Sequence, residues 1–270
     1  MKRSHFLAGT AAGLGCYTPF ANALGANVKP NYVLVHGAFS DETAWQYVVP
    51  VLERAGARVS TVTLPGHSDA DTAMAGRFTL ADYVAAITAK LDEAGAPVIL
   101  VGHSMGGVAI TQTAELHPGK IAALIYLSAY LPETGKALLD YSQDSQSKLG
   151  PNIVIDKDRG IGTITVETMQ AAFFNTTPSA LAIAAEKRLR PEPLQPFVTP
   201  VATTSANFGK LPRYYITTLR DQAVGPALQK AMYTAQSVHH VYPLDADHSS
   251  YFSKPDQLAA ALLDVREQVG

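Results

Sequence analysis

The sequence predicts an α/β protein in which a mostly parallel sheet is flanked by helices. Short apolar runs alternate with helix-like segments along most of the chain, as they do when parallel strands are joined by crossover helices. The 270 residues are 47% hydrophobic, which is enough to bury one large core. Because the sequence has neither internal repeats nor a convincing low-complexity segment, we expect a single globular domain.

The strands and helices follow one another in a regular order. Strands are expected at residues 31–37, 57–67, 97–103, 120–132, 213–221 and 237–244. Helices are expected at residues 44–56, 79–95, 105–119, 225–236 and 255–268. Gly56 is placed to end the first helix, and Thr79 is placed to cap the second. The run 97–103 predicts the most deeply buried strand.

The alternation stops between about residues 132 and 208. This part contains a polar stretch and then two expected short helices, which are separated by a turn at Pro178 and followed by several prolines. An irregular insertion of this length is more often a lid over a site than part of the scaffold. We therefore expect one domain over residues 24–270 that carries a cap at about 132–208.

Residues 1–23 are typical of an export signal. Lys2 and Arg3 precede an uncharged run of small and apolar residues, and residues 21–23 fit the A-x-A pattern of a signal-peptidase site. We expect export from a bacterium to the periplasm or the medium, by the Sec or the twin-arginine route. Cys16, the only cysteine, lies in this signal, so the mature chain would lack a thiol nucleophile. The apolar run is too short to span a bilayer by itself, and we expect no stable membrane insertion once the signal has been removed.

The charge pattern excludes some classes of partner. The formal net charge is -2, from 21 Lys and Arg against 23 Asp and Glu, and no long run of either sign occurs. We therefore expect no nucleic-acid partner. No His or Cys cluster has the spacing of metal ligands, so we expect neither a metal nor an organic cofactor. The sequence leaves the oligomeric state open.

The stretch GHSMG, from Gly102 to Gly106, lies between an expected strand and an expected helix. It matches G-x-S-x-G, which in this setting is typical of a nucleophile elbow with strained serine backbone angles. Gly102 and Gly106 lack a Cβ, so the strand and the helix can approach closely. Ser104 is therefore the expected nucleophile, at the positive end of a helix dipole.

A serine hydroxyl needs a base, and in this arrangement an acid and then a histidine follow the serine along the chain. Of the eight histidines, only His248 lies in the loop between the last strand and the last helix, so we expect it to be the general base. Asp221, at the end of the penultimate strand, is the favoured acid. Asp247 is a weaker candidate beside the histidine, and Glu133 occupies an alternative place after an earlier strand.

Two backbone N–H groups are expected to bind the oxyanion of an acyl-transfer reaction. One belongs to Met105, directly after the nucleophile. The other belongs to the loop after the first strand, where Gly37 lets the chain turn. Ala38 is favoured for this role over Phe39.

Together these residues resemble the α/β-hydrolase superfamily, and within it the plant methylesterase and hydroxynitrile lyase family with its bacterial esterase relatives. The resemblance rests on LVHGAFSDETAWQYVVPVLERAG, VILVGHSMGG, IYLSAYLPETG, RLRPEPLQPFVTP, PRYYITTLRDQAV and DADHSSYFSKPDQLAAALL. It implies an α/β-hydrolase fold with an inserted cap, a triad of Ser104, Asp221 and His248, and oxyanion amides at Ala38 and Met105.

The resemblance also implies ester hydrolysis rather than cyanohydrin cleavage. The lyases of this family resemble one another in a threonine after the first-strand histidine and a lysine after the catalytic histidine. This chain has Gly37 and Ser249 there, so it lacks the cation that would stabilise cyanide.

We expect a small ester with a hydrophobic or aromatic part, bound without a cofactor by Phe39, Phe173 and Phe174, although the last two could equally pack the cap. A thioester or lactone hydrolase, a cyanohydrin lyase and a slow-turnover small-molecule receptor remain as alternatives. His67, in LPGHSD, is expected in a surface loop.

Overall fold

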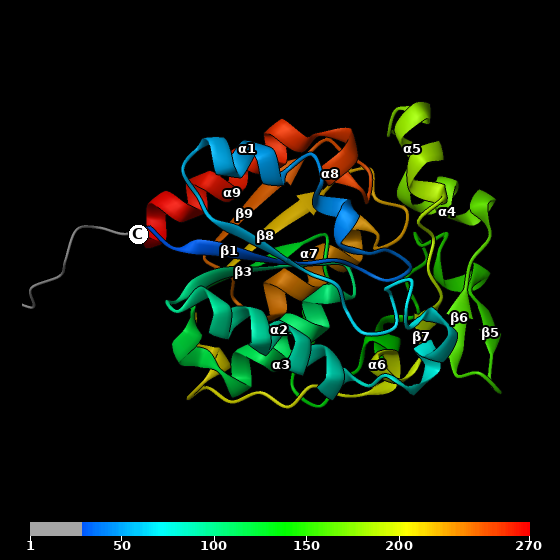
Figure 1. The fold of residues 1–270 in the computed structure, drawn as a ribbon, viewed down its shortest axis with the longest axis horizontal. Coiled ribbons are helices and arrows are strands. Elements are labelled where there is room, and N and C mark those ends of the chain that lie inside the picture. Colours follow the sequence, from blue (N-terminus) through cyan, green and yellow to red (C-terminus); the bar gives the residue numbers. More distant parts are fainter. Residues whose placement is uncertain (1–28) are drawn as a thin grey trace, which may run out of the picture.

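The computed structural model describes residues 29–270, and Figure 1 shows their fold. Six parallel strands form one sheet in the order β2-β1-β3-β4-β8-β9. Their bounds are Asn31–Val35 (β1), Val59–Val62 (β2), Val98–His103 (β3), Ile121–Leu127 (β4), Arg213–Thr218 (β8) and His240–Leu244 (β9). The predicted α/β class with a parallel sheet is confirmed. The export signal predicted at residues 1–23 lies outside the described residues.

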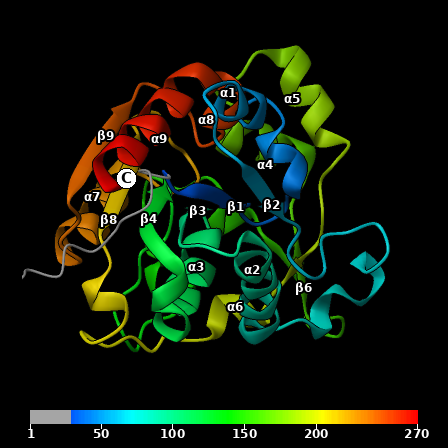
Figure 2. The same ribbon diagram turned by 60° about the vertical axis from the view of Figure 1, so that its left-hand side comes forward.

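Helices cover both faces of this sheet. On one face α1 (Val49–Arg54) packs beside α9 (Pro255–Val269), and on the other α2 (Leu80–Ala94) packs beside α3 (Gly106–Leu116) (Figure 1). Helix α7 (Pro226–Ala235) packs along β8, and the short α8 (Ser250–Ser253) leads into α9 (Figure 2). Every residue of β3 is buried, as expected for a central strand covered on both faces.

Two local predictions can be compared directly with the helices. The side chain of Thr79 accepts a hydrogen bond from the N–H of Asp82, whose carboxylate accepts one from the N–H of Thr79, so the predicted cap of α2 is confirmed as a capping box. The single helix predicted at 44–56 is wrong. A 3-10 turn over Glu42–Trp45 precedes α1, whose first turn contains Pro50.

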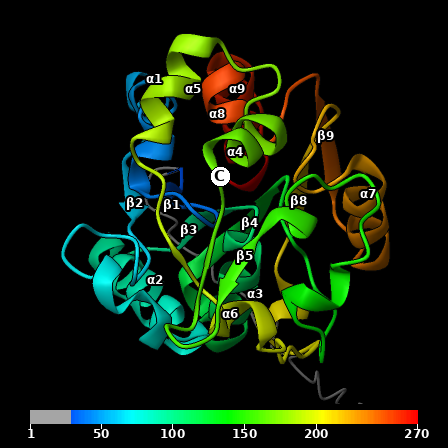
Figure 3. The same cartoon turned by 90° about the vertical axis from the view of Figure 1, so that its right-hand side faces the viewer.

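Most of the segment between β4 and β8 lies in front of the main sheet in Figure 3, and its last residues run along α3. It contains a three-stranded antiparallel sheet of β5 (Val154–Asp156), β6 (Ile161–Thr163) and β7 (Glu192–Pro193). It also contains the helices α4 (Val166–Phe173), α5 (Ser179–Glu186) and α6 (Gln195–Val198), and Pro178 directly precedes α5. We refer to residues 132–208 as the cap segment.

The parallel arrangement places four loops at one edge of the sheet. Because all six strands run the same way, the loops that follow β1, β3, β8 and β9 leave from their shared carboxyl end, beside the cap segment (Figure 1). The register aligns the ends of the three central strands, with Val35 opposite Gly102 and Gly102 opposite Tyr126. In open α/β sheets this edge is the usual place for a ligand.

Within residues 29–270, no helix combines the length and the apolar character that crossing a membrane would require. The same residues contain no group of three or more His, Cys, Asp or Glu side chains arranged to hold a metal ion.

Candidate active site

Ser104 lies in a strained turn between β3 and α3. Its φ is +53°, in the left-handed region that residues with a Cβ rarely adopt. A Cβ on Gly106 would lie 2.6 Å from the carbonyl oxygen of His36, and a Cβ on Gly102 would lie 2.8 Å from the carbonyl oxygen of Gly106. Glycines at these two positions therefore allow the ends of β1 and β3 to pack directly against the start of α3.

Asp221 and His248 meet at the same edge, from the loops that follow β8 and β9. Oδ2 of Asp221 lies 2.8 Å from Nδ1 of His248, and both side chains are buried. Nε2 of His248 has no hydrogen-bond partner in the described part of the chain. This geometry fits a ring that donates its Nδ1–H to the carboxylate and leaves the Nε2 lone pair free to accept a proton.

The Asp221 carboxylate is held by four further donors. Oδ1 accepts the backbone N–H groups of Ala223 at 2.8 Å and Val224 at 2.9 Å. Oδ2 accepts the hydroxyl of Thr218 at 2.8 Å and the side-chain amide of Gln229 at 3.0 Å. These bonds fix the position of the carboxylate opposite the histidine. Sequence reasoning missed Gln229, although a polar residue on the buried face of an otherwise ordinary helix was a usable signal.

The two rival acids are engaged elsewhere. Asp247 is fully buried, and its carboxylate accepts the N–H of Thr176, the hydroxyl of Thr177 and the hydroxyl of Ser253 at 2.8–2.9 Å. It therefore joins the cap segment to the loop of the candidate base. Glu133 is exposed and lies in the cap segment. Of the three predicted candidates, Asp221 is the one whose carboxylate contacts the His248 ring.

The backbone N–H groups of Ala38 and Met105 are available to a ligand. No hydrogen bond among residues 29–270 uses either group, and both residues line one cavity together with Ser104. The N–H of Phe39 is instead donated to Oε2 of Glu192 at 3.0 Å. A Cβ on Gly37 would lie 2.8 Å from the Cβ of Ser104, so this loop packs directly on the candidate nucleophile. We call residues 37–41 the oxyanion loop.

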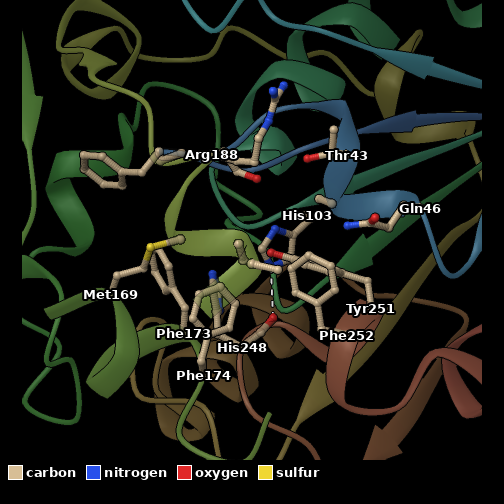
Figure 4. Close-up of a pocket in the computed structure, with 16 residues that line it drawn as sticks. Thr43, Gln46, His103, Met169, Phe173, Phe174, Arg188, His248, Tyr251 and Phe252 are labelled. Atoms are coloured by element: carbon tan, nitrogen blue, oxygen red, sulfur yellow. Dashed lines mark hydrogen bonds between the residues drawn. The ribbon is translucent and has the colours of Figure 1, made fainter. Parts of the chain in front are cut away.

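His103, the residue before the candidate nucleophile, supports the loop of the candidate base. Its Nε2 lies 3.0 Å from the carbonyl oxygen of His248, and the two ring centroids are 4.5 Å apart (Figure 4). Burial, and then the nearby His248, lower the pKa of His103 well below the usual range, so its ring is neutral. A neutral ring with a proton on Nε2 can donate to that carbonyl.

Two cavities flank the candidate residues. A cavity of about 590 Å³ is lined by Ser104, Met105 and Ala38 and is otherwise mostly apolar, with Tyr130, Leu138, Leu149, Ile153, Leu194 and Phe197 among its walls. A much narrower cavity of about 30 Å³ lies beside His248 and includes the predicted contacts Phe39, Phe173 and Phe174 (Figure 4). Ala38 lines both cavities, so the two lie on either side of the oxyanion loop.

The prediction that His67 lies in a surface loop is wrong. Its side chain is fully buried, and Nε2 lies 2.8 Å from Oε2 of Glu192 in β7. Glu192 also accepts the hydroxyl of Tyr83 from α2 at 3.1 Å. The turn residues of LPGHSD predict a loop correctly, but the cap segment covers that loop and supplies the buried partner.

The cap segment is bonded to all three loops of the candidate site. The N–H of Arg190 donates to the carbonyl oxygen of Phe39 at 3.1 Å in the oxyanion loop. Near Asp221, Asp144 accepts the N–H of Gly225 at 2.6 Å. Near His248, the N–H of Ser249 donates to the carbonyl oxygen of Phe173 at 3.2 Å, besides the bonds of Asp247. The cap segment therefore braces the site as well as covering it.

Known proteins share both the sequence pattern and the fold. The sequence pattern described as "Alpha/beta hydrolase family" matches residues 32–261. The chain belongs to the alpha/beta hydrolase family. This hydrolase is 31% identical over 244 residues to a pyrethroid hydrolase of Sphingobium wenxiniae, with 87% of each chain covered. The family and fold implied by the sequence resemblance are thus confirmed.

Plant relatives and solved structures agree with this assignment. The hydrolase is 29% identical over 258 residues to methylesterase 7 of Arabidopsis thaliana, with 90% of this chain and 98% of that protein covered. Three longer relatives are the chloroplastic proteins of Arabidopsis thaliana named as methylesterases 11, 15 and 13. The chain spans only 63%, 58% and 58% of their respective lengths. A crystal structure of a pyrethroid hydrolase superposes with a TM-score of 0.81 at 28% identity, covering 88% of this chain and 98% of that one.

Proposed function

We propose that this alpha/beta hydrolase cleaves carboxylic esters through an acyl-Ser104 intermediate. One observation carries the proposal. The buried His248 ring is bound to Asp221 through Nδ1 and its Nε2 has no partner in the described chain, while its carbonyl and its ring contact His103, the residue before the strained Ser104. Nucleophilic acyl transfer by a serine requires a base with a free ring nitrogen, an acid that orients the base, and a serine held in a fixed turn beside them.

In the proposed mechanism, the Ser104 Oγ attacks the ester carbonyl carbon while His248 takes the hydroxyl proton on Nε2. The carbonyl oxygen becomes an oxyanion, which accepts the N–H groups of Ala38 and Met105. When the tetrahedral intermediate collapses, the C–O bond to the alcohol breaks and His248 returns the proton to the departing oxygen. Water then attacks the acyl-serine with His248 again as base, which releases the acid and restores Ser104.

The two cavities suggest how the ester is oriented. His248 must reach the leaving oxygen, so the alcohol part belongs on its side, where the cavity measures about 30 Å³. The acyl part then occupies the cavity of about 590 Å³ beside Ser104, whose walls are mostly apolar. We therefore propose esters that join a hydrophobic acid to a compact alcohol. The names of the relatives, a pyrethroid hydrolase and methylesterases, support ester substrates in general.

Ester cleavage is favoured over cyanohydrin cleavage by the surroundings of His248. Ser249, the next residue, is fully buried, and its hydroxyl donates to the hydroxyl of Tyr251 at 3.1 Å. Arg188, which lines the narrow cavity, donates two hydrogen bonds to Asp41. Neither residue supplies a free cation for a cyanide leaving group.

Pre-steady-state kinetics test this function. The purified protein and the Ser104→Ala variant are mixed with p-nitrophenyl acetate and butyrate, and release of p-nitrophenol is followed; mandelonitrile cleavage is measured in parallel. We expect a burst or steady turnover that disappears in the variant, with esterase activity above lyase activity. Equal ester turnover in both proteins would remove Ser104 as the nucleophile. A ligand that raises the melting temperature without being consumed would favour a receptor.

We also propose that the enzyme acts after export, on the basis of the signal-like residues 1–23. Cell fractionation and mass spectrometry of the mature N-terminus test this location. Recovery of the uncleaved chain from the cytoplasm alone would contradict it.

A further inference from the structure

We propose that Glu192 is a positioning residue that orients the oxyanion loop, so that the cap segment sets the direction of the Ala38 N–H. The Glu192 carboxylate is hydrogen-bonded to Phe39, His67 and Tyr83 rather than to Ser104 or His248, so its effect would pass through Phe39. The inference rests on the proposed function, because it assigns the Ala38 N–H a role in binding an oxyanion.

Both backbone groups of Phe39 are bound by the same short stretch of the cap segment. Its N–H donates to Oε2 of Glu192 at 3.0 Å, and its carbonyl oxygen accepts the N–H of Arg190 at 3.1 Å. Phe39 is fully buried and has a φ of +60°, in the left-handed region that is costly for a residue with a Cβ. These two bonds stabilise that conformation, because a more extended Phe39 would point its N–H and carbonyl elsewhere.

The orientation of Phe39 determines that of Ala38. The peptide group between them is planar, so fixing the Phe39 N–H on Glu192 also fixes the carbonyl of Ala38. On the other side of Ala38, Gly37 packs against the Cβ of Ser104 at a distance that leaves no room for a Cβ. Ala38 is thus held from both ends. Its N–H has no hydrogen bond in the described chain, and the residue lines the cavity that contains Ser104.

Glu192 is itself held rigidly. Its Oε2 also lies 2.8 Å from Nε2 of His67, and its Oε1 accepts the Tyr83 hydroxyl at 3.1 Å. All three side chains are fully buried. A carboxylate with this many buried donors has a fixed geometry, since any rotation would leave a buried polar group without a partner.

The oxyanion loop is also attached to the cap segment by ion pairs that do not involve Glu192. The buried carboxylate of Asp41 accepts hydrogen bonds from Arg188 at 2.6 and 2.9 Å and contacts Arg190 at 3.3 Å. Changing Glu192 should therefore alter the orientation of residues 38 and 39 while the loop stays attached. This makes a positioning role separable from a purely structural one.

The test compares Glu192→Ala, Glu192→Gln and the matched control Glu115→Ala. Glu115 is also a largely buried carboxylate that bonds the cap segment, accepting the N–H groups of Thr204 and Phe208 at 2.8 and 3.1 Å, but it does so from α3, outside both cavities. Its variant therefore measures the general effect of removing such a carboxylate. Glu192→Gln keeps an oxygen that can accept the Phe39 N–H and so tests for rescue.

The readouts are kcat and KM per folded molecule and the affinity for a hydrophobic trifluoromethyl ketone, whose hydrated or serine-bound oxygen occupies the oxyanion site. For Glu192→Ala we expect kcat and inhibitor affinity to fall together by about 10- to 100-fold, with KM changed less than about threefold. For Glu192→Gln we expect kcat within about tenfold of the wild type, and for Glu115→Ala we expect unchanged kcat. Loss of activity in Glu192→Ala only in proportion to the unfolded fraction would overturn the proposal.

Amide hydrogen exchange separates this proposal from the proposed function. If Glu192 holds the loop, the Phe39 amide exchanges faster in Glu192→Ala than in Glu115→Ala, by at least about tenfold. If the Phe39 amide exchanges faster in Glu192→Ala but the wild-type protein cleaves no ester, the loop contact is supported and only the proposed function is contradicted. Unchanged exchange at Phe39 together with unchanged inhibitor affinity would contradict the positioning role itself.

Discussion

Nε2 of His103 lies 3.0 Å from the carbonyl oxygen of His248, so the residue beside the candidate nucleophile anchors the loop that carries the candidate base. The contact joins residues 145 positions apart in the chain. It links the turn after β3 to the loop after β9. In the proposed mechanism a proton passes between Ser104 in that turn and His248 in that loop. A small displacement of either loop would change the distance over which that proton moves.

We expect His103→Phe to lower kcat by about 10- to 100-fold, because the phenyl ring fills the space but cannot donate to the His248 carbonyl. The exposed His240, in the edge strand β9, provides a control in His240→Phe. Steady-state kinetics and the far-UV circular dichroism of both variants check this expectation. Wild-type kcat in His103→Phe would show that the contact does not position the base.

The two buried aspartates should respond differently to loss of charge. Asp221→Asn should lower kcat by about 10⁴-fold, because an amide in place of the carboxylate favours the wrong histidine tautomer. Asp247→Asn should lower kcat by less than about tenfold and instead reduce the free energy of unfolding by roughly 1–3 kcal/mol, because its carboxylate bonds cap residues. Kinetics and urea unfolding of both variants are the measurements. The reverse ranking of the two kcat values would mean that Asp247 is the acid.

The buried pair of His67 and Glu192 predicts a pH dependence of stability. Burial alone would lower the pKa of His67, but the charge and hydrogen bond of Glu192 outweigh it and raise the pKa above its ordinary value of 6.5. The protonated ring therefore stabilises the folded chain fully below pH 6.5, and this contribution disappears as the pH rises through the folded-state pKa.

Urea unfolding between pH 6 and 9 tests this dependence in the wild type and in His67→Gln. We expect the wild type to lose an increment of stability on the alkaline side that the variant does not lose. His36, whose ring contacts that of His67 at 4.9 Å, contributes in the opposite sense, because burial and the nearby His67 lower its pKa to about 3. Parallel curves for the two proteins over the whole range would show that His67 is not protonated in the folded state.

The two cavities predict separate control of the two halves of the ester. Met169→Ala would enlarge the narrow cavity, so it should raise kcat/KM for a benzyl ester relative to the methyl ester of the same acid by about tenfold. Leu149→Ala would enlarge the other cavity and should shift preference toward bulkier acids among methyl esters. Product formation by both variants is measured on the same panel of esters. If Met169→Ala changed acid preference instead, the assignment of the two cavities would be reversed.

The sequence predicted those parts of the site that depend on local motifs and on the order of strands. Ser104 lies between glycines that its turn requires, and Asp221 and His248 follow the strands whose ends meet in any sheet of this order. The choice of Ala38 over Phe39 rested on no local motif, because both residues follow the same glycine. It depends on Glu192, which binds the Phe39 N–H from 153 positions away.

Residues whose roles depend on long-range packing were not predicted from the sequence. His67 lies among turn residues, and only the packing of β7 against its loop buries it and places a carboxylate beside it that raises its pKa. Gln229 appeared as one polar residue in an amphipathic helix, and its contact with Asp221 depends on how α7 packs along β8. Such long-range contacts leave no periodic signal in the sequence.

The bonds from the cap segment to all three site loops have a consequence for how substrate enters. Lifting the cap segment as a rigid flap would break the contacts of Arg190 with Phe39 and of Asp144 with Gly225, and would disturb both the oxyanion and acid loops. The wider cavity reaches the surface beside the exposed side chains of Leu139, Ile155 and Val198. We therefore expect esters to enter, and acids to leave, through this apolar mouth while the cap segment stays in place.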